Sequence, residues 1–243
     1  MSGHSKWAQI KRQKGANDQK RGLAFTKLGN AITIAVKQGG GIGDPDQNFK
    51  LRLAVDAARA QNMPKENIER AISRAQGKDA GAMDEVMYEG FAPNGISVIV
   101  EAATDNKNRT TSEVQSAFDK NGGTMGQPGS VNYNFKQVGQ IIITKNGKTL
   151  DDIFMIAAEA GAEDVEDAGE EIVVYTAPSS LSKVREALQN TGLTVGATEL
   201  IWKPLTLIEV EPGEQADKIM NMLEKIEDLD DVQKVYSNFE IKS

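Results

Sequence analysis

Residues 86–122, VMYEGFAPNGISVIVEAATDNKNRTTSEVQSAFDKNG, decide the fold class of most of this 243-residue chain. Two β-rich runs, Val86–Phe91 and Ile96–Ala103, come before a stretch in which apolar residues have helical spacing. The letters TTSE at 110–113 fit a capping box at the start of that helix, and NG at 121–122 fits its end. Two strands followed by a helix predict a sheet that is covered by helices.

The same alternation continues to the C-terminus and follows a polar link, GKDAGA, at 77–82. Further strands are predicted at Ser130–Phe135, Gln140–Thr144, Ile172–Thr176, Thr198–Trp202, Leu205–Val210 and Val232–Ser237. The predicted helices cover about 110–121, 150–160, 180–191 and 213–227. Eight strands and four helices divide into two α+β sandwiches, each with two helices on one face of an antiparallel sheet. This number of strands and helices is typical of two ferredoxin-like domains, but it does not indicate which strands pair.

The N-terminal part of the chain is helical instead. Apolar residues recur at three- and four-residue steps from Phe25 to the glycine run Gly39–Gly41, which is typical of a helix end. A second helix is predicted from about Asp46 to Gln61, and a third begins near Pro64. These three helices predict a small domain. Residues 1–16 have no amphipathic period, and we interpret them as a tail, or as a helix that forms when bound.

Charge is divided unevenly along the chain, whose formal net charge is −7. Residues 1–78 hold 15 Lys and Arg against six Asp and Glu, a net charge of +9. The remainder carries −16. Because an acidic remainder repels a polyanion, the asymmetry indicates nucleic-acid binding by the N-terminal end.

Several function classes are excluded by what the chain lacks. Without cysteine it has no disulfide scaffold, thiolate zinc site or cysteine nucleophile, and its single histidine, His4, excludes multi-histidine metal sites. The phosphate-loop, zinc-protease and esterase motifs are absent, and the glycine-rich stretch Gly39–Gly43 follows a helix rather than a strand. The acidic runs lack the ligand spacing of a calcium loop. The sequence therefore predicts a non-enzymatic protein with no cofactor, no metal and no small-molecule substrate.

No apolar run approaches the ~20 residues that cross a bilayer. The polar, basic start of the chain is also unlike a secretory signal. We therefore expect a cytoplasmic protein without a membrane partner.

The tail carries the first candidate nucleic-acid contacts. Trp7 lies among basic residues and can stack on a base while the cations bind phosphates, an arrangement formed by Lys6, Trp7, Lys11, Arg12 and Lys14. The alternative is that Trp7 and Ile10 pack against the core of the helical domain. Trp7 could stack on a base in one state of the protein and pack against the helical core in another.

Cations at helical spacing form the second set of candidates, and they comprise Lys20, Arg21, Lys27, Arg52 and Arg59. Arg70 and Arg74 point outward on the predicted third helix but are not in this set. Some of these charges could instead form local ion pairs, such as Arg52–Asp56 or Glu66–Arg70. A third candidate is the loop with Asn106, Asn108 and Arg109, which comes before a predicted helix N-terminus, where anions are favoured. Its alternative is a polar loop that caps the helix.

The ordered motifs resemble the YebC family, bacterial relatives of a mitochondrial translational activator of cytochrome c oxidase. The resemblance covers essentially the whole chain and rests on GHSKW at 3–7, KRG at 20–22, FTK at 25–27, the glycines 39–41 before DPD at 44–46, NMP at 62–64, YEGF at 88–91, DNKNRT at 105–110, GSV at 129–131 and EAGAED at 159–164. Two departures are Lys11-Arg12-Gln13-Lys14, which lacks the histidine common in the family, and a longer loop after Gly41.

The resemblance implies three domains, one of them inserted in another. Mapped here, they are a basic helical domain with its tail at 1–78, a middle α+β domain at 79–135 plus 205–243, and an inserted α+β domain at 136–204. It also implies a probable DNA-binding transcriptional regulator, or a protein that binds messenger or ribosomal RNA and acts in translation by activating it or relieving stalling. A second alternative is an adaptor that binds a protein through the acidic α+β domains. Charge reversal at Lys11, Arg12 and Lys14 separates the nucleic-acid-binding regulator from the adaptor.

Overall fold

The computed structural model describes residues 18–77 and 83–242, in two compact units. Residues 135–203 form one unit, and the parts of the chain before and after them form the other. The α+β class with an N-terminal helical region is confirmed. The domain boundaries expected from the sequence stay a prediction, and the link expected at 77–82 lies mostly outside the described residues.

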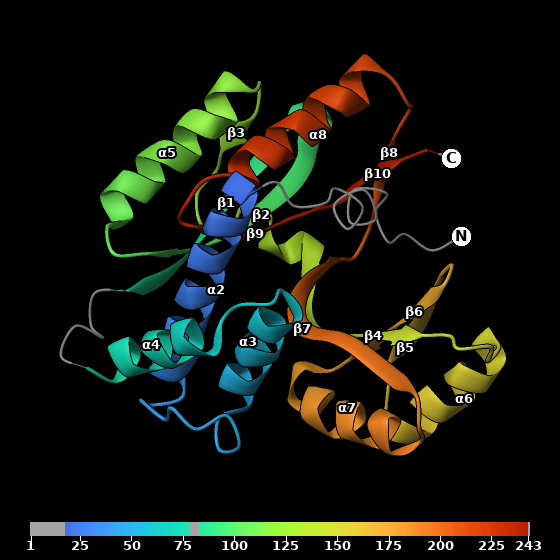
Figure 1. Ribbon diagram of the computed structural model, residues 1–243. Helices are drawn as coiled ribbons and strands as arrows, with labels where there is room; N and C mark the ends of the chain where they lie inside the picture. The colour runs from blue at the N-terminus through green and yellow to red at the C-terminus, as the bar shows by residue number, and fades with distance from the viewer. Residues whose placement is uncertain (1–17, 78–82, 243) are drawn as a thin grey trace. The chain divides into compact units, whose positions relative to one another are not determined.

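Three helices form the N-terminal part of the larger unit, namely α2 (Asp18–Gln38), α3 (Phe49–Ala60) and α4 (Lys65–Gln76) (Figure 1). Their apolar stripes meet in one core, in which Ile32 and Leu51 are fully buried. Helix α2 ends directly before Gly39, and Gly40 and Gly41 take positive φ angles of 69° and 87°. Glycine tolerates this conformation, so the run ends the helix and turns the chain.

A four-stranded sheet in the order β3-β1-β2-β9 follows, and every adjacent pair is antiparallel. Its elements are β1 (Asp84–Ala92), β2 (Ile96–Thr104), α5 (Lys107–Lys120), β3 (Thr124–Met125), α8 (Glu214–Glu227) and β9 (Val232–Ser237). Helices α5 and α8 contact each other and cover one face (Figure 1). A parallel pair, β8 (Ile208–Val210) and β10 (Phe239–Ile241), completes the unit.

Strand β2 is buried on both faces. Val98 and Val100 belong to the core beneath α5 and α8, whereas Ile99, which points the other way, is also fully buried. Helix α2 contacts β2 and β9, so the three helices and the sheet pack as one unit.

The smaller unit has the element order β4-α6-β5-β6-α7-β7, which is the ferredoxin-like order expected from the sequence. Its elements are β4 (Phe135–Thr144), α6 (Leu150–Ala160), β5 (Asp164–Ala168), β6 (Glu171–Thr176), α7 (Leu181–Asn190) and β7 (Thr194–Pro204). The sheet order is β5-β6-β4-β7. In the four-stranded sheet of the larger unit the β1–β2 hairpin comes first, and the covering helices α5 and α8 come after it, so the two sheets differ in how their strands are connected.

Two local predictions are wrong. The strand expected at Ser130–Phe135 is a turn with a short 3₁₀ helix at Asn132–Asn134, because the Glu89 carboxylate accepts hydrogen bonds from backbone N–H groups of this segment. The capping box expected at 110–113 is also wrong: α5 begins three residues earlier, at Lys107, with Asn106 as its N-cap.

Strand boundaries also differ near the C-terminus. The strands expected at Thr198–Trp202 and Leu205–Val210 are β7 and the shorter β8. Strands β3, β5 and β10 lack the apolar runs that would reveal them in the sequence, because they are short or rich in acidic residues.

Candidate nucleic-acid interface

The tail candidates Lys6, Trp7, Lys11, Arg12 and Lys14 lie outside the described residues. Lys20 and Arg21 belong to α2, but their side chains are likewise outside the described part. The remaining candidates can be placed, and they fall at three separate locations.

Lys27 lies where α2 meets α8. Its Nζ donates to the backbone carbonyl of Glu227, at the C-terminal end of α8, where unpaired carbonyls favour a cation. Farther along α2, Lys37 Nζ donates to the Met83 carbonyl at 2.8 Å and pairs with Asp84 at 3.3 Å. These two ammonium groups join α2 to the sheet and its helices, so a phosphate would have to compete with the contacts they already make.

Arg52 and Arg59 lie on α3. Arg52 donates from Nε to the Pro45 carbonyl and from Nη2 to the Asp46 carbonyl, both at 3.0 Å, so its guanidinium holds the loop before α3. Arg59 is more accessible: its side chain is 70% exposed and its pair with Asp56 is long, at 4.0 Å. Of the two, Arg59 is better placed to reach a ligand.

The loop before α5 is held by its own contacts. Asn106 Oδ1 accepts from the Arg109 N–H at 3.1 Å and thereby caps the helix, as the alternative interpretation expected, while Asn108 is exposed. The Arg109 guanidinium pairs with Asp105 at 3.0 Å and with Asp231 at 2.6 Å. Hydrogen bonding to Asp231, the largest cause, and then to Asp105 raises the pKa of Arg109. A phosphate at this loop would meet an arginine that already has two carboxylate partners.

A groove of about 300 Å³ lies between α2 and α4 and was not expected from the sequence. Its lining combines an aromatic ring, two amides and two guanidinium groups, and consists of Phe25, Thr26, Gly29, Asn30, Met63, Asn67, Arg70, Ala71 and Arg74. Arg70 and Arg74, one turn apart on α4, are both exposed. Arg74 Nη2 reaches Thr33 Oγ1 at 3.4 Å, and Arg70 has no ion pair within the described residues. The outward arginines of α4 and the aromatic ring of α2 therefore meet at one place.

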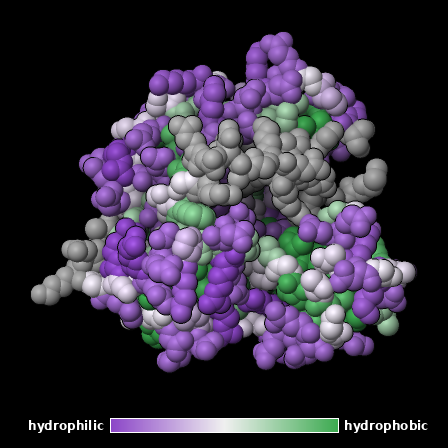
Figure 2. Space-filling view, viewed as in Figure 1, coloured by the Kyte–Doolittle hydropathy of each residue, from purple (hydrophilic) through white to green (hydrophobic). Residues whose placement is uncertain are grey.

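A second groove of similar volume, about 310 Å³, lies between α3 and α4, with Arg59 and Lys65 in its lining. Met63 contributes to both grooves. The visible surface of α3 and α4, at the lower left of Figure 2, is largely hydrophilic. One sequence signal for the first groove was available, because Asn30 interrupts the apolar stripe of α2 two residues before the buried Ile32.

Metal and membrane sites were also sought in residues 18–77 and 83–242. No three of their His, Cys, Asp and Glu side chains come together as a metal ligand set. Among their helices, none combines the length and the apolar character needed to cross a bilayer.

Comparison with known proteins matches almost the whole chain to two domain models of one protein family. Residues 5–78 match the "TACO1/YebC protein N-terminal domain" and residues 83–239 match the "TACO1/YebC second and third domain". The chain belongs to the TACO1/YebC family. The resemblance found in the sequence motifs is thereby confirmed.

Relatives in this family are similar over their full length. A "Probable transcriptional regulatory protein" of Roseiflexus castenholzii is 51% identical and is matched over 100% of this chain and 96% of its own. One from Geobacter sulfurreducens is 46% identical, with 100% and 97% covered. The crystal structure of a conserved hypothetical protein from Aquifex aeolicus superposes with a TM-score of 0.88 at 42% identity, covering 98% of each chain.

Proposed function

We propose that this TACO1/YebC family member is a non-enzymatic, nucleic-acid-binding regulator of gene expression. The carrying observation is the division of charge, with +9 on residues 1–78 and −16 on the rest. A protein with this division presents one end to a polyanion. The transcriptional-regulator names of its relatives support the same class.

DNA-binding transcription regulation is the first form of this proposal. RNA binding in translation is the alternative, and one structural observation favours it. Among the side chains of α2–α4 that the structure describes, there is no dense row of Arg, Asn and Gln for reading base edges in the major groove. The cations of these helices suit phosphates and unpaired bases equally well.

Charge reversal in the tail tests nucleic-acid binding. Lys11, Arg12 and Lys14 are changed together to Glu, and affinity for duplex DNA and for single-stranded RNA is measured across a salt series. We expect a loss of at least tenfold and a shallower dependence on salt, since each lost phosphate contact reduces the slope by about 0.7–0.9. The matched control changes three exposed lysines elsewhere, Lys120, Lys148 and Lys183, to Glu. Equal effects of the two triple variants would overturn the proposal.

Crosslinking in cells then separates the two targets, with DNA and RNA both recovered and sequenced. Enrichment at a few promoters that is lost in the tail variant supports transcription. Dominant crosslinks to messenger or ribosomal RNA support translation.

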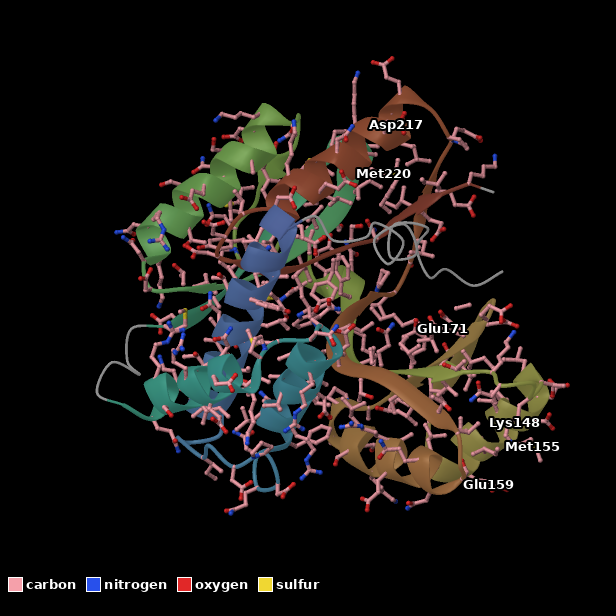
Figure 3. The ribbon with its side chains drawn as sticks, in the orientation of Figure 1. Lys148, Met155, Glu159, Glu171, Asp217 and Met220 are labelled. Carbon is pink, nitrogen blue, oxygen red and sulfur yellow. The ribbon has the colours of Figure 1, made fainter. Side chains whose placement is uncertain are left out.

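A second function, as a protein-binding adaptor, is favoured by one surface of the smaller unit. Phe154 and Met155 on α6 are 52% and 64% exposed, although both are large and apolar. Carboxylates flank them along the helix: Asp151 precedes them. Glu159 lies one turn after Met155, and Figure 3 labels both side chains. An apolar pair with acidic neighbours suits a basic amphipathic segment of another protein. Substituting Ser for both residues should abolish cellular function but spare nucleic-acid affinity if the adaptor function is the correct one.

A further inference from the structure

The groove between α2 and α4 has a feature that the fold does not use. Asn30 lines it and is only 8% exposed, but within the described residues its side-chain amide has no hydrogen-bond partner. The amide is not among the fully buried unpaired side-chain atoms of the described residues, so it is open to the groove, and its donors and its acceptor are available to a ligand. An unpaired amide on the wall of a groove is a position where a ligand can supply the partner.

The groups around Asn30 divide by chemistry. Phe25 and Met63 offer an apolar surface with an aromatic ring, and Phe25 packs against the helical core, which holds it in place. Asn67 adds a second amide from α4. Arg70 and Arg74 add two exposed positive charges, one turn apart. The aromatic ring can stack on the face of a base, the two amides can hydrogen-bond to its edge, and the two guanidinium groups can bind phosphate. These are three features by which a protein recognises a nucleotide.

Resting on the function proposed above, we propose that this groove binds one unpaired nucleotide of a nucleic-acid strand. The base lies against Phe25, its edge bonds to Asn30, and the adjoining phosphates bind Arg70 and Arg74. The nucleotide must be unpaired, because a base stacked within a duplex cannot enter a groove between two helices to reach Asn30, a residue that is only 8% exposed. The volume of about 300 Å³ is at the small end of ligand pockets and suits a single nucleotide.

The first test compares the base contact with the phosphate contact. Binding is measured by fluorescence anisotropy with a labelled 12-nucleotide single-stranded RNA, the matching DNA, and an abasic DNA strand of the same length. Asn30→Leu should lower the affinity for the base-containing strands at least fivefold and leave the affinity for the abasic strand unchanged. Arg70→Gln and Arg74→Gln should weaken all three at least threefold. The control is Lys65→Gln, which removes the same charge from the same helix, outside this groove, and should have no comparable effect.

Asn30→Leu also gives a readout that a structural role would not produce. Leucine is a better helix former and leaves no unpaired amide, so the melting temperature should stay unchanged or rise while binding falls. A second variant, Gly29→Leu, places a side chain in the groove, because Gly29 belongs to its lining. A Cβ at Gly29 would meet no atom within 4 Å, so the substitution causes no clash in the fold. The variant should fold and lose affinity for base-containing strands to the same extent.

Any of three outcomes would overturn the inference without affecting the proposed function. The first is an unchanged strand affinity in both Asn30→Leu and Gly29→Leu, and the second is a loss of affinity for the abasic strand equal to that for the base-containing strands. The third is a free mononucleotide that binds as tightly as the strand. If the unmodified protein binds neither RNA nor DNA, the proposed function itself fails. The ratio of the two affinities shows whether RNA or DNA is the preferred strand. Asn30→Leu should lower the affinity for the preferred strand and so bring this ratio closer to one.

Discussion

Arg109 donates from Nη2 to Oδ2 of Asp231 at 2.6 Å, although the two residues lie 122 positions apart in the chain. The same carboxylate oxygen accepts from Thr110 Oγ1 at 2.6 Å and from Thr104 Oγ1 at 3.0 Å. Asp231 therefore joins the end of β2 and the start of α5 to the turn before β9. Burial raises the pKa of the Asp231 carboxyl, but the hydrogen bonds from Thr110, Arg109 and Thr104 outweigh it, so the pKa lies below its ordinary value.

Asp231→Asn should lower the free energy of unfolding at pH 7 by about 2 kcal/mol, because charge-assisted hydrogen bonds are lost from a buried position. A carboxyl whose pKa is lower in the folded protein stabilises it above the unfolded pKa of about 3.9. That contribution disappears as the pH falls through the folded pKa. The variant and the parent should therefore converge in urea unfolding as the pH falls below about 4. Asp230→Asn, at an exposed neighbour, is the control, and a difference that stays constant with pH would contradict this account.

Glu89 organises the loop between β3 and β4. Although only 3% exposed, its carboxylate accepts from the backbone N–H groups of Gly129, Val131 and Asn132 at 2.8, 2.7 and 2.9 Å. Burial raises the pKa of Glu89, but these three bonds outweigh it and lower the pKa below its ordinary value.

Glu89→Gln should destabilise the protein by about 2–3 kcal/mol at pH 7, because an amide offers one acceptor oxygen where three donors converge. Amide hydrogen exchange at Gly129, Val131 and Asn132 should accelerate more than exchange in α5. Because the folded pKa is lowered, the effect should fade below about pH 4. Glu113→Gln, exposed on α5, should change neither quantity. Retained protection of the three amides would show that the loop does not depend on Glu89.

These two carboxylates explain where sequence reasoning succeeded and where it failed. Helices α6 and α8 were predicted nearly to the residue, because helical periodicity and caps are local signals. The strand expected at Ser130–Phe135 fails because Glu89, about 40 positions earlier, draws the backbone into a turn. Likewise, nothing near Arg109 in the sequence points to Asp231. The groove between α2 and α4 was not predicted for the same reason, because Phe25 and Arg74 come together only when α2 packs on α4.

Asn48 should be indispensable to the helical region in a way that its N-cap role alone does not require. Its Oδ1 accepts from the Leu51 N–H at 3.1 Å, while its Nδ2 donates to the carbonyls of Ala35 and Ile42 at 2.9 and 3.1 Å. Aspartate is normally as good an N-cap as asparagine. Here Asn48→Asp would place a carboxylate against two carbonyl oxygens, so it should cost at least as much as Asn48→Ala, about 1–3 kcal/mol. Thermal melts of both variants check this order, and an Asp variant as stable as the parent would contradict it.

Two glycines should respond to alanine with opposite signs. At Gly90 on β1, an added Cβ would lie 2.6 Å from Phe118 Cε1 and 2.7 Å from the Thr124 carbonyl oxygen. The Phe118 ring is fully buried and the carbonyl belongs to the paired strand β3, so neither can yield, and Gly90→Ala should cost about 1–3 kcal/mol or more. At Gly22 in α2 a Cβ meets nothing within 4 Å, and Gly22→Ala should stabilise by about 0.5–1 kcal/mol through helix propensity. Urea unfolding of both variants measures the two changes. A neutral Gly90→Ala would mean that β1 can move away from β3 without loss, which the position of Phe118 between α5 and the sheet argues against.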